Sequence, residues 1–153
     1  MDMIIRTVSL KEYMAFRQSL QSWNTEVRVN DQGILEAMKD SILNGEKVHG
    51  AFINGQLAGI IDSSEEVFKT SENLQVKELL IGTIFVHPAF RDKGIGKELV
   101  QYVVKRAKTD YVITDPIDDK AQEFFMHCGF IPNEIFEMDN GGSWMMVREI
   151  YPT

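Results

Sequence analysis

The pattern of hydrophobic and polar positions begins with one strand and two helices. Residues 4–8 are an apolar β-rich run, and Ser9 with Glu12 has the spacing of a capping box, which predicts that a helix begins there. Asp31 is placed to cap a second helix, which Gly45 would end in the left-handed conformation that glycine tolerates. The predicted order of this part is therefore β, α, α.

Three strands are predicted next. The runs 48–53 and 56–61 are separated by an Asn-Gly pair at 54–55, which favours the type I′ turn of a tight hairpin. Residues 62–75 are polar and acidic, so we interpret them as a solvated connection. Residues 76–86 form a long apolar run that is typical of a buried strand.

Helices and strands alternate in the second half of the chain. The pattern predicts a helix to about residue 108, a strand over 111–114, a helix from Asp118 to Gly129, and a last hairpin of strands 131–138 and 144–150 around Asn140. A β-α-β-α-β order implies parallel strands joined by crossover helices, here with antiparallel hairpins on either side. We therefore predict a single α/β domain over residues 1–153, with a mixed central sheet, flanking helices and the order β-α-α-β-β-β-α-β-α-β-β.

Composition and charge narrow the function. The 153 residues are 44% hydrophobic and 25% charged, which is ordinary for one soluble globular domain. Sixteen Lys and Arg against 23 Asp and Glu give a net charge of −7, which disfavours binding to nucleic-acid phosphates. We expect no nucleic-acid partner. The acidic balance is compatible with an amine-bearing partner, although most surface charge serves solubility.

The cysteine and the histidines of the sequence argue against disulfide-bonded and metal-binding classes of protein. A single cysteine, Cys128, leaves no intramolecular disulfide and favours a reducing cytoplasm. His49, His87 and His127 fall in separate segments without metal-ligand spacing, so we expect no metal site. No apolar run approaches the ~20 residues that span a bilayer, and no secretory signal is present, so we expect no membrane partner.

The segment 84–99 has the pattern of an anion site: a strand, a proline stop, then a glycine turn that opens a helix. Gly94 and Gly96 carry no Cβ, so backbone N–H groups can approach a ligand closely, and the helix start adds about half a positive charge. Arg91 and Lys93 add charge and donors, and a pyrophosphate would fit. The alternative is a glycine turn that only joins strand to helix.

Two other phosphate motifs do not match this segment. A Walker-type loop needs four residues between its first glycine and a Gly-Lys pair, with Ser or Thr after it, and Gly96-Lys97 is followed by Glu98. A dinucleotide fingerprint needs a third glycine or alanine where Leu99 stands. Neither class of nucleotide site is therefore predicted.

The chain resembles the GNAT superfamily of N-acetyltransferases, whose acetyl-CoA motif is Gln/Arg-x-x-Gly-x-Gly/Ala after a strand ending in Val-x-Pro. The sequence Arg-Asp-Lys-Gly-Ile-Gly at 91–96 matches this motif completely. Residues 121–130, which end in Cys-Gly-Phe, are similar to the family's later helix and its exit into the next strand. The order of elements extends the resemblance over nearly the whole chain and implies a GNAT-like fold.

The resemblance implies acetyl-CoA as cosubstrate and direct acetyl transfer to a primary amine of a small molecule or peptide, without a covalent enzyme intermediate. Backbone groups around the end of the long strand would bind the pantetheine arm and acetyl carbonyl, and the glycine loop would hold the pyrophosphate. The implied cofactor-binding residues are Phe85, Val86, Arg91, Asp92, Lys93, Gly94, Ile95, Gly96 and Lys97.

The sequence departs from the family pattern at the catalytic positions. Phe125 stands where many relatives have a tyrosine, and a phenyl ring cannot protonate the leaving thiolate, so that proton falls to water. Cys128 is interpreted as a packing residue. No carboxylate lies in the middle of the long strand; Glu78, nearer its start, is our candidate base, with a solvated strand-end charge as the alternative.

Two functions therefore stay open at the level of sequence. The first is an acyltransferase, an acetyl-CoA:amine N-acetyltransferase. The second is a non-catalytic acyl-CoA-binding or sensing module on the same fold, which Phe125 and the missing central carboxylate motivate. A homodimer through the last hairpin also stays open.

Overall fold

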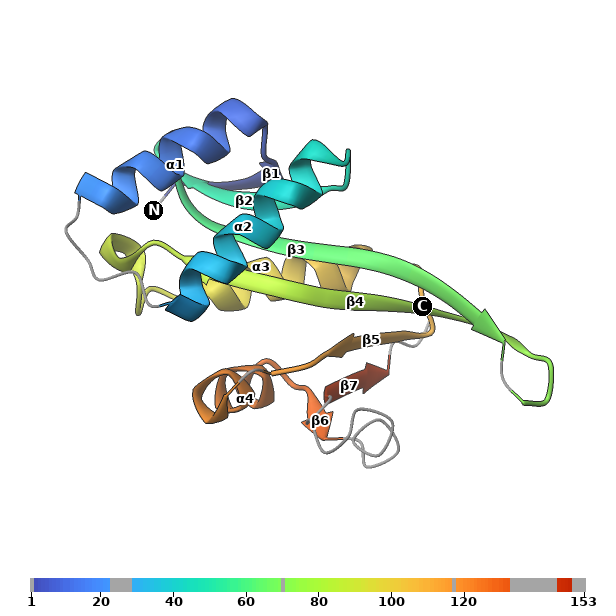
Figure 1. Cartoon of the computed structure of the whole chain (residues 1–153). Coiled ribbons are helices and arrows are strands. Elements are labelled where there is room, and N and C mark those ends of the chain that lie inside the picture. Colours follow the sequence, from blue (N-terminus) through green and yellow to red (C-terminus); the bar gives the residue numbers. More distant parts are fainter. Residues whose placement is uncertain (1, 23–28, 70, 117, 133–145, 150–153) are drawn as a thin grey trace. The chain divides into compact units, whose positions relative to one another are not determined.

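The computed structural model describes residues 2–22, 29–69, 71–116, 118–132 and 146–149 (Figure 1). Residue contacts form two compact units, one of Met1–Ser63 with Thr83–Tyr102 and one of Ser64–Gly82 with Val103–Thr153. That the chain is a single domain stays a prediction. The order of helices and strands is the predicted one, and the α/β class is confirmed.

The first unit is built on an antiparallel arrangement of strands. Strand β1 (Met3–Thr7) pairs with β2 (Val48–Ile53), and β2 pairs with β3 (Gln56–Lys69). Between β2 and β3, Asn54 and Gly55 have φ values of 50° and 82°. Positive φ at both central residues defines the type I′ turn, so this part of the hairpin prediction is confirmed.

Two helices pack on these strands, and their ends follow from local hydrogen bonds. Helix α1 (Leu10–Ser22) begins with the predicted capping box: the Ser9 N–H donates to Glu12 Oε1 at 3.0 Å, and the Glu12 N–H donates to Ser9 Oγ at 3.2 Å. Helix α2 (Val29–Leu43) ends at Gly45, whose φ is 78°. Both boundaries confirm the prediction.

The predicted cap of α2 was wrong. This helix begins at Val29, so Asp31 lies in its first turn and not at its N-cap. An acidic residue is favourable at either place, because the helix dipole attracts negative charge throughout the first turn. The sequence signal therefore locates the start of the helix only to within two or three residues.

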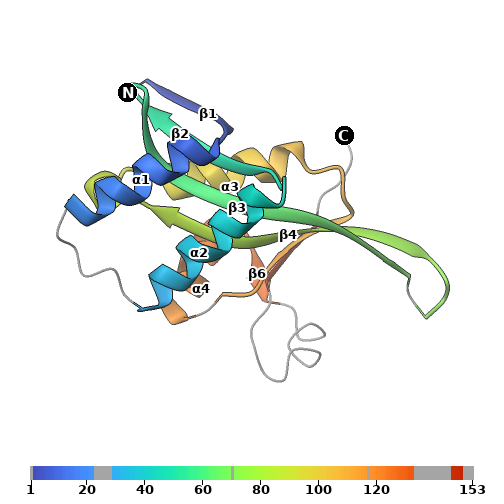
Figure 2. The same cartoon turned by 45° about the horizontal axis from the view of Figure 1, so that its top comes forward.

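Helices α1 and α2 lie across the same face of β2 and β3 (Figures 1 and 2). They pack beside each other through the buried Tyr13, whose hydroxyl donates to the Leu35 carbonyl oxygen, and through an Arg17–Glu36 ion pair of 2.5 Å. The core under them consists of Val8, Tyr13, Phe16, Leu20, Leu35, Met38, Val48, Phe52, Leu57, Ile60 and Phe85.

Helix α3 (Ile95–Arg106) begins on the opposite face of β3. Ile60 belongs to the core under α1 and α2, and its neighbour Gly59 therefore faces the other way. A Cβ on Gly59 would lie 3.2 Å from Ile95 Cγ2 and 3.2 Å from Leu99 Cδ1. The absence of a side chain at Gly59 thus lets α3 dock closely on the strand.

Strand β3 continues to Lys69, so the prediction of a solvated connection over 62–75 was wrong for residues 62–69. The side chains of Glu65, Glu66 and Val67 are exposed, which removes the apolar alternation that identifies strands in a sequence. Its neighbour in the sheet is β4 (Gln75–Val86), and backbone hydrogen bonds to a neighbouring strand do not require apolar side chains. The strand is thus specified by pairing.

The second unit contains the parallel part of the sheet. Strand β4 pairs in parallel with β5 (Tyr111–Thr114), and β7 (Met146–Glu149) pairs antiparallel with β5 and with β6 (Ile131–Pro132). The strand order is β1-β2-β3-β4-β5-β7-β6, which confirms a mixed sheet. The described strands of the last hairpin are shorter than predicted, and its turn at Asn140 lies outside the described residues.

Helix α4 (Asp119–His127) follows β5 in the second unit. The carboxylate of Asp118 accepts a 2.8 Å hydrogen bond from the Ala121 N–H, which confirms the predicted N-cap. Gly129, with a φ of 95°, ends the helix as predicted.

Two glycine substitutions test the packing of the first unit. We expect Gly59→Ala to lower the free energy of unfolding by about 1–3 kcal/mol, because the methyl group would press on Ile95 and Leu99. Gly33→Ala, on the exposed side of α2 with no atom within 4 Å of the new Cβ, should raise it by about 0.5–1 kcal/mol. Urea denaturation measures both. Equal stability of Gly59→Ala and wild type would contradict the close docking of α3.

Candidate functional site

An exposed loop joins strand β4 to helix α3 within the first unit. After Val86 the chain forms a short 3₁₀ turn, η1 (Pro88–Phe90), and residues 91–94 then lie exposed before α3 begins at Ile95. Asp92 and Gly94 adopt left-handed backbone conformations, with φ values of 63° and 77°. A Cβ on Gly94 would meet no atom within 4 Å, so the space beside the loop is open to a ligand.

The start of α3 supplies hydrogen-bond donors at this loop. The Glu98 N–H donates to the Gly94 carbonyl oxygen at 3.1 Å, which is the first i to i−4 bond of the helix. The backbone N–H groups of Ile95, Gly96 and Lys97 precede that bond and have no acceptor in the helix itself. Together with the positive end of the helix dipole, they suit a phosphate group.

The side chains of the loop are mainly cationic. Arg91, Lys93 and Lys97 are basic and only Asp92 is acidic between residues 91 and 97, and all four are exposed. The guanidinium of Arg91 donates from Nε to the Val86 carbonyl oxygen at 3.0 Å. This region is therefore locally positive in a protein whose net charge is −7.

Aromatic rings hold two of these cations in place. The Arg91 guanidinium carbon lies 5.5 Å from the centroid of the Phe85 ring, and Lys93 Nζ lies 5.6 Å from the centroid of the Phe90 ring. Cation–π contacts of this length add about 0.5–1 kcal/mol at exposed sites. The end of β4 and η1 thus orient the charges that the loop presents.

The structure brings all nine predicted cofactor-binding residues into the first unit. The ring of Phe85 is buried against Phe16, which leaves its backbone as the part that a ligand could contact. The carbonyl oxygen of Val86 accepts from Arg91, which leaves its second lone pair for a further contact. That these residues bind a cofactor stays a prediction.

His87 has no role predicted from the sequence, and the structure places it at the base of the loop. The side chain is only 2% exposed, and its Nδ1 accepts a 3.0 Å hydrogen bond from the Ala89 N–H. Its Nε2 lies 2.9 Å from the hydroxyl of Ser19 on α1. The available signal was an acceptor side chain directly before Pro88, because Pro is frequent at the first position after an N-cap.

The protonation state of His87 follows from these contacts. Because Nδ1 accepts a bond from a backbone N–H, the ring proton of the neutral imidazole sits on Nε2 and points to Ser19. Burial lowers the pKa of His87, a hydrogen bond with the backbone of Ser19 opposes that effect, and the positive charge of Arg91 lowers the pKa further. His87 is therefore neutral near pH 7.

Glu78 lies on β4 in the second unit, opposite Tyr111 in the parallel register. It is only 7% exposed, so the alternative of a solvated strand-end charge was wrong. Burial raises the pKa of Glu78, and the negative charge of Glu66 raises it further. A carboxylate with a pKa moved toward neutrality is what a general base requires, which keeps Glu78 as a candidate.

The region around Phe125 in the second unit is apolar. Phe125 is buried, with its ring centroid 5.1 Å from that of Phe124 and 5.5 Å from that of Phe130, both edge-on. Cys128 is buried as well, which confirms its role as a packing residue. Helix α4 therefore presents a hydrophobic cluster at the position where the resemblance implies a tyrosine.

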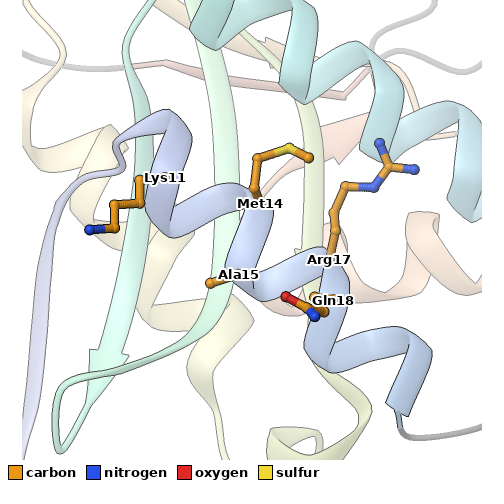
Figure 3. A pocket seen from close by; sticks show the side chains of 5 residues that line it. All are labelled: Lys11, Met14, Ala15, Arg17 and Gln18. Atoms are coloured by element: carbon orange, nitrogen blue, oxygen red, sulfur yellow. The ribbon is translucent and has the colours of Figure 1, made fainter.

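A hollow elsewhere on the first unit contains none of the predicted site residues. It has a volume of about 510 Å³ and lies along α1, lined by Lys11, Met14, Ala15, Arg17 and Gln18 (Figure 3). Four of these side chains are polar or small, and they come from one helix. This hollow offers no convergent polar groups of a binding site.

Metal-ligand groups and membrane-spanning helices are both missing from the part of the chain that the structure describes. There, no three His, Cys, Asp or Glu side chains come close enough together to hold a metal ion. None of the helices in that part is both long enough and apolar enough to cross a membrane.

Comparison with known proteins gives one matching family model, described as the Acetyltransferase (GNAT) family, over residues 13–130. A relative in Schizosaccharomyces pombe (strain 972 / ATCC 24843), named Uncharacterized N-acetyltransferase C663.13c, is 31% identical over 101 residues. These are 63% of this chain and 66% of the relative, so the match spans just under two thirds of the relative's length.

Solved structures share the fold at low identity. A mutant of the AtaT toxin, bound to acetyl-CoA and to the C-terminus of the antitoxin AtaR, matches with a TM-score of 0.68 at 15% identity, covering 97% of this chain and 94% of AtaT. AtaT complexed with acetyl-methionyl-tRNAfMet matches with a TM-score of 0.68 at 13% identity, covering 97% of this chain and 95% of AtaT. Bacillus subtilis N-acetyltransferase YlbP, with coenzyme A, gives 0.60 at 17%, with 97% of both chains covered.

The neutral state of His87 predicts how stability depends on pH. Its pKa in the folded protein lies below the ordinary value of 6.5, so the unfolded chain takes up the proton first as the pH falls. We expect the melting temperature to fall as the pH drops below about 6.5, until the folded pKa is reached. His87→Asn, whose amide oxygen can accept from Ala89 but does not titrate, should show a smaller fall.

The same measurement on the variant controls for other groups. Burial raises the pKa of Asp62 and of Asp115. Protonation of these two carboxyls on acidification therefore favours the folded protein, which is opposite to the effect of His87. They are present in both proteins, so the difference between the two pH profiles isolates His87. Parallel profiles would contradict a buried neutral imidazole at this position.

Proposed function

Because the chain belongs to the acetyltransferase (GNAT) family, we propose that it transfers the acetyl group of acetyl-CoA to a primary amine of a small molecule or peptide. The observation that carries this proposal is the exposed cationic loop 91–97, which opens helix α3 with three donor N–H groups. A pyrophosphate needs positive charge and convergent donors, and this loop supplies both.

Family membership confirms the resemblance and the enzyme class predicted from the sequence, an acyltransferase. Acetyl-CoA is the cosubstrate, as the acetyl-CoA and coenzyme A bound in AtaT and YlbP support. The alternative of a non-catalytic sensing module has no separate observation in its favour, because the apolar cluster around Phe125 removes one proton donor and not the binding loop.

Different residues of the loop have different roles in the proposed binding of acetyl-CoA. In our proposal the N–H groups of Ile95, Gly96 and Lys97 and the ammonium groups of Lys93 and Lys97 bind the pyrophosphate. Backbone groups of Phe85 and Val86 bind the pantetheine arm. Asp92 and Gly94 give the turn its left-handed backbone, and Arg91 anchors the loop to β4 through Val86.

Bound acetyl-CoA supplies the activated thioester, and the chain's residues act on the protons. The acceptor amine must lose a proton to become a nucleophile, and in our proposal the Glu78 carboxylate takes it. A bond then forms from the amine nitrogen to the acetyl carbon, and the bond from that carbon to sulfur breaks. Phe125 has no proton to give, so water protonates the thiolate.

The charges around Glu78 favour a cationic amine as acceptor. The negative charge of Glu66 raises the pKa of Glu78, and both residues belong to the second unit. An ammonium would relieve the repulsion between them. The net charge of −7 argues in the same direction and against a nucleic-acid substrate, although AtaT is solved with a tRNA.

The cellular location and the oligomeric state of the protein stay predictions. The single Cys128 favours the reducing cytoplasm as the location. A homodimer is compatible with the family fold and rests on no contact in this structure.

Acetyl-CoA binding tests the proposed loop. Saturation at about 100 times the dissociation constant should stabilise the wild type by about 2.7 kcal/mol and raise its melting temperature by several degrees. The double variant Lys93→Gln, Lys97→Gln should raise the dissociation constant at least about tenfold, because two charge-assisted contacts to phosphate are lost.

A matched double variant separates the effect of the loop's charge on acetyl-CoA binding from the effect of the overall charge. Lys105→Gln with Lys108→Gln also removes two exposed lysines, one from the last turn of α3 and one just beyond it, and should leave the dissociation constant unchanged. Equal weakening by both double variants would mean that only the overall charge matters. No stabilisation of a folded wild type would reject the acetyl-CoA site.

The role of Glu78 predicts a pH-dependent rate. With an amine acceptor found by a thiol-release screen, Glu78→Gln should lower kcat by about 100- to 10,000-fold and leave the KM for acetyl-CoA unchanged. Activity of the wild type should fall as the pH drops through the raised pKa of Glu78. Glu66→Gln removes a charge that raises this pKa, so it should move the acidic limb to lower pH. An unchanged rate in Glu78→Gln would assign deprotonation to water.

A further inference from the structure

His87 joins three elements of the first unit at one buried point. Its backbone N–H donates to the Ala58 carbonyl oxygen on β3 at 2.8 Å, and its carbonyl oxygen accepts from the Phe90 N–H at 2.8 Å. Its two ring nitrogens contact Ala89 in η1 and Ser19 on α1. His87 therefore connects a strand, a turn and a helix through hydrogen-bond contacts.

On the side of the loop, His87 fixes the residues that carry charge. The imidazole caps η1 through Ala89, and its ring centroid lies 6.0 Å from that of Phe90, nearly edge-on. The ring of Phe90 in turn holds the ammonium of Lys93 at 5.6 Å. A contiguous chain of contacts therefore leads from the buried imidazole to an exposed cation of the loop.

On the side of α1, the imidazole packs into the hydrophobic core. Its ring centroid lies 5.8 Å from that of Phe16, which also meets Phe85 at 6.2 Å. The hydroxyl of Ser19, one turn further along α1, meets Nε2. The ring that caps η1 is thus in direct contact with two residues of α1.

We propose that His87 is a positioning residue, which holds the 91–96 loop in its acetyl-CoA-binding geometry by tying that loop to helix α1. This inference rests on the proposed function of the loop. His87 does not act as a base toward Ser19, because its Nδ1 lone pair is taken by Ala89 and its Nε2 carries the proton. Its contribution is to affinity for acetyl-CoA and not to the chemical step.

Substitutions at His87 separate its two hydrogen bonds. Asparagine places an acceptor oxygen at the position of Nδ1 and can cap η1, whereas glutamine places its amide nearer to Ser19 and loses the cap. Leucine fills the space and supplies neither bond. The loop-positioning role therefore predicts that affinity for acetyl-CoA decreases in the order wild type, His87→Asn, then His87→Gln and His87→Leu.

The experiment measures the dissociation constant of acetyl-CoA by titration calorimetry, together with kcat and the KM for acetyl-CoA, on the full chain. His87→Leu should raise the dissociation constant and the KM about tenfold, and kcat at saturating acetyl-CoA should stay within about threefold. His87→Asn should recover most of the lost affinity. A split between KM and kcat is not expected from a residue that only stabilises the fold.

A buried serine elsewhere in the first unit provides the matched control. Ser41 on α2 donates to Asp62 on β3 at 2.8 Å, so Ser41→Ala also breaks a buried helix-to-strand hydrogen bond. It should lower the melting temperature and leave acetyl-CoA affinity unchanged. An equal loss of affinity in Ser41→Ala and His87→Leu would overturn the positioning role, as would wild-type affinity in His87→Leu.

The outcomes also separate this inference from the function on which it rests. A wild type that does not bind acetyl-CoA rejects the proposed function. Binding that depends on Lys93 and Lys97 but not on His87 rejects only the positioning role. If His87→Leu does not fold, the comparison of His87→Asn with His87→Gln decides, and equal or tighter binding by His87→Gln overturns the inference.

Discussion

The passage from strand β4 into helix α3 imposes the main constraint on the first unit. The chain leaves a hydrogen-bonded sheet at Val86 and must present backbone N–H groups to solvent by Ile95, without leaving buried polar groups unsatisfied on the way. His87 and Arg91 meet this requirement with their side chains, through Ala89 and the Val86 carbonyl. The exposed loop is therefore supported by hydrogen bonds, one of them from the buried side chain of His87.

The charges of this protein have opposite signs in two places. The protein carries a net charge of −7, yet the loop at the start of α3 is positive, and the buried carboxyl of Glu78 lies near a second acidic residue, Glu66. A cofactor with an anionic pyrophosphate and an acceptor with a cationic amine have opposite electrostatic needs. The positive loop lies in the first unit, and both acidic residues lie in the second unit.

Local sequence signals predicted the boundaries that depend on local hydrogen bonds. The capping box of Ser9 and Glu12, the Asn-Gly turn before β3 and the N-cap Asp118 each need only a few neighbouring residues, so their patterns were sufficient. The extension of β3 to Lys69 was missed, because its exposed side chains carry no apolar alternation and pairing with another strand specifies it.

The candidate site was likewise predictable only where it depends on neighbouring residues. The sequence by itself determined the Arg-x-x-Gly-x-Gly loop, its local charge and the family, because glycine spacing and helix starts are properties of adjacent residues. Only the tertiary structure revealed that His87 links α1 to the loop and that Glu78 is buried with a raised pKa. Burial and long-range hydrogen bonds arise from residues far apart in the chain, here Ser19 and His87, and no local pattern of residues encodes such a meeting.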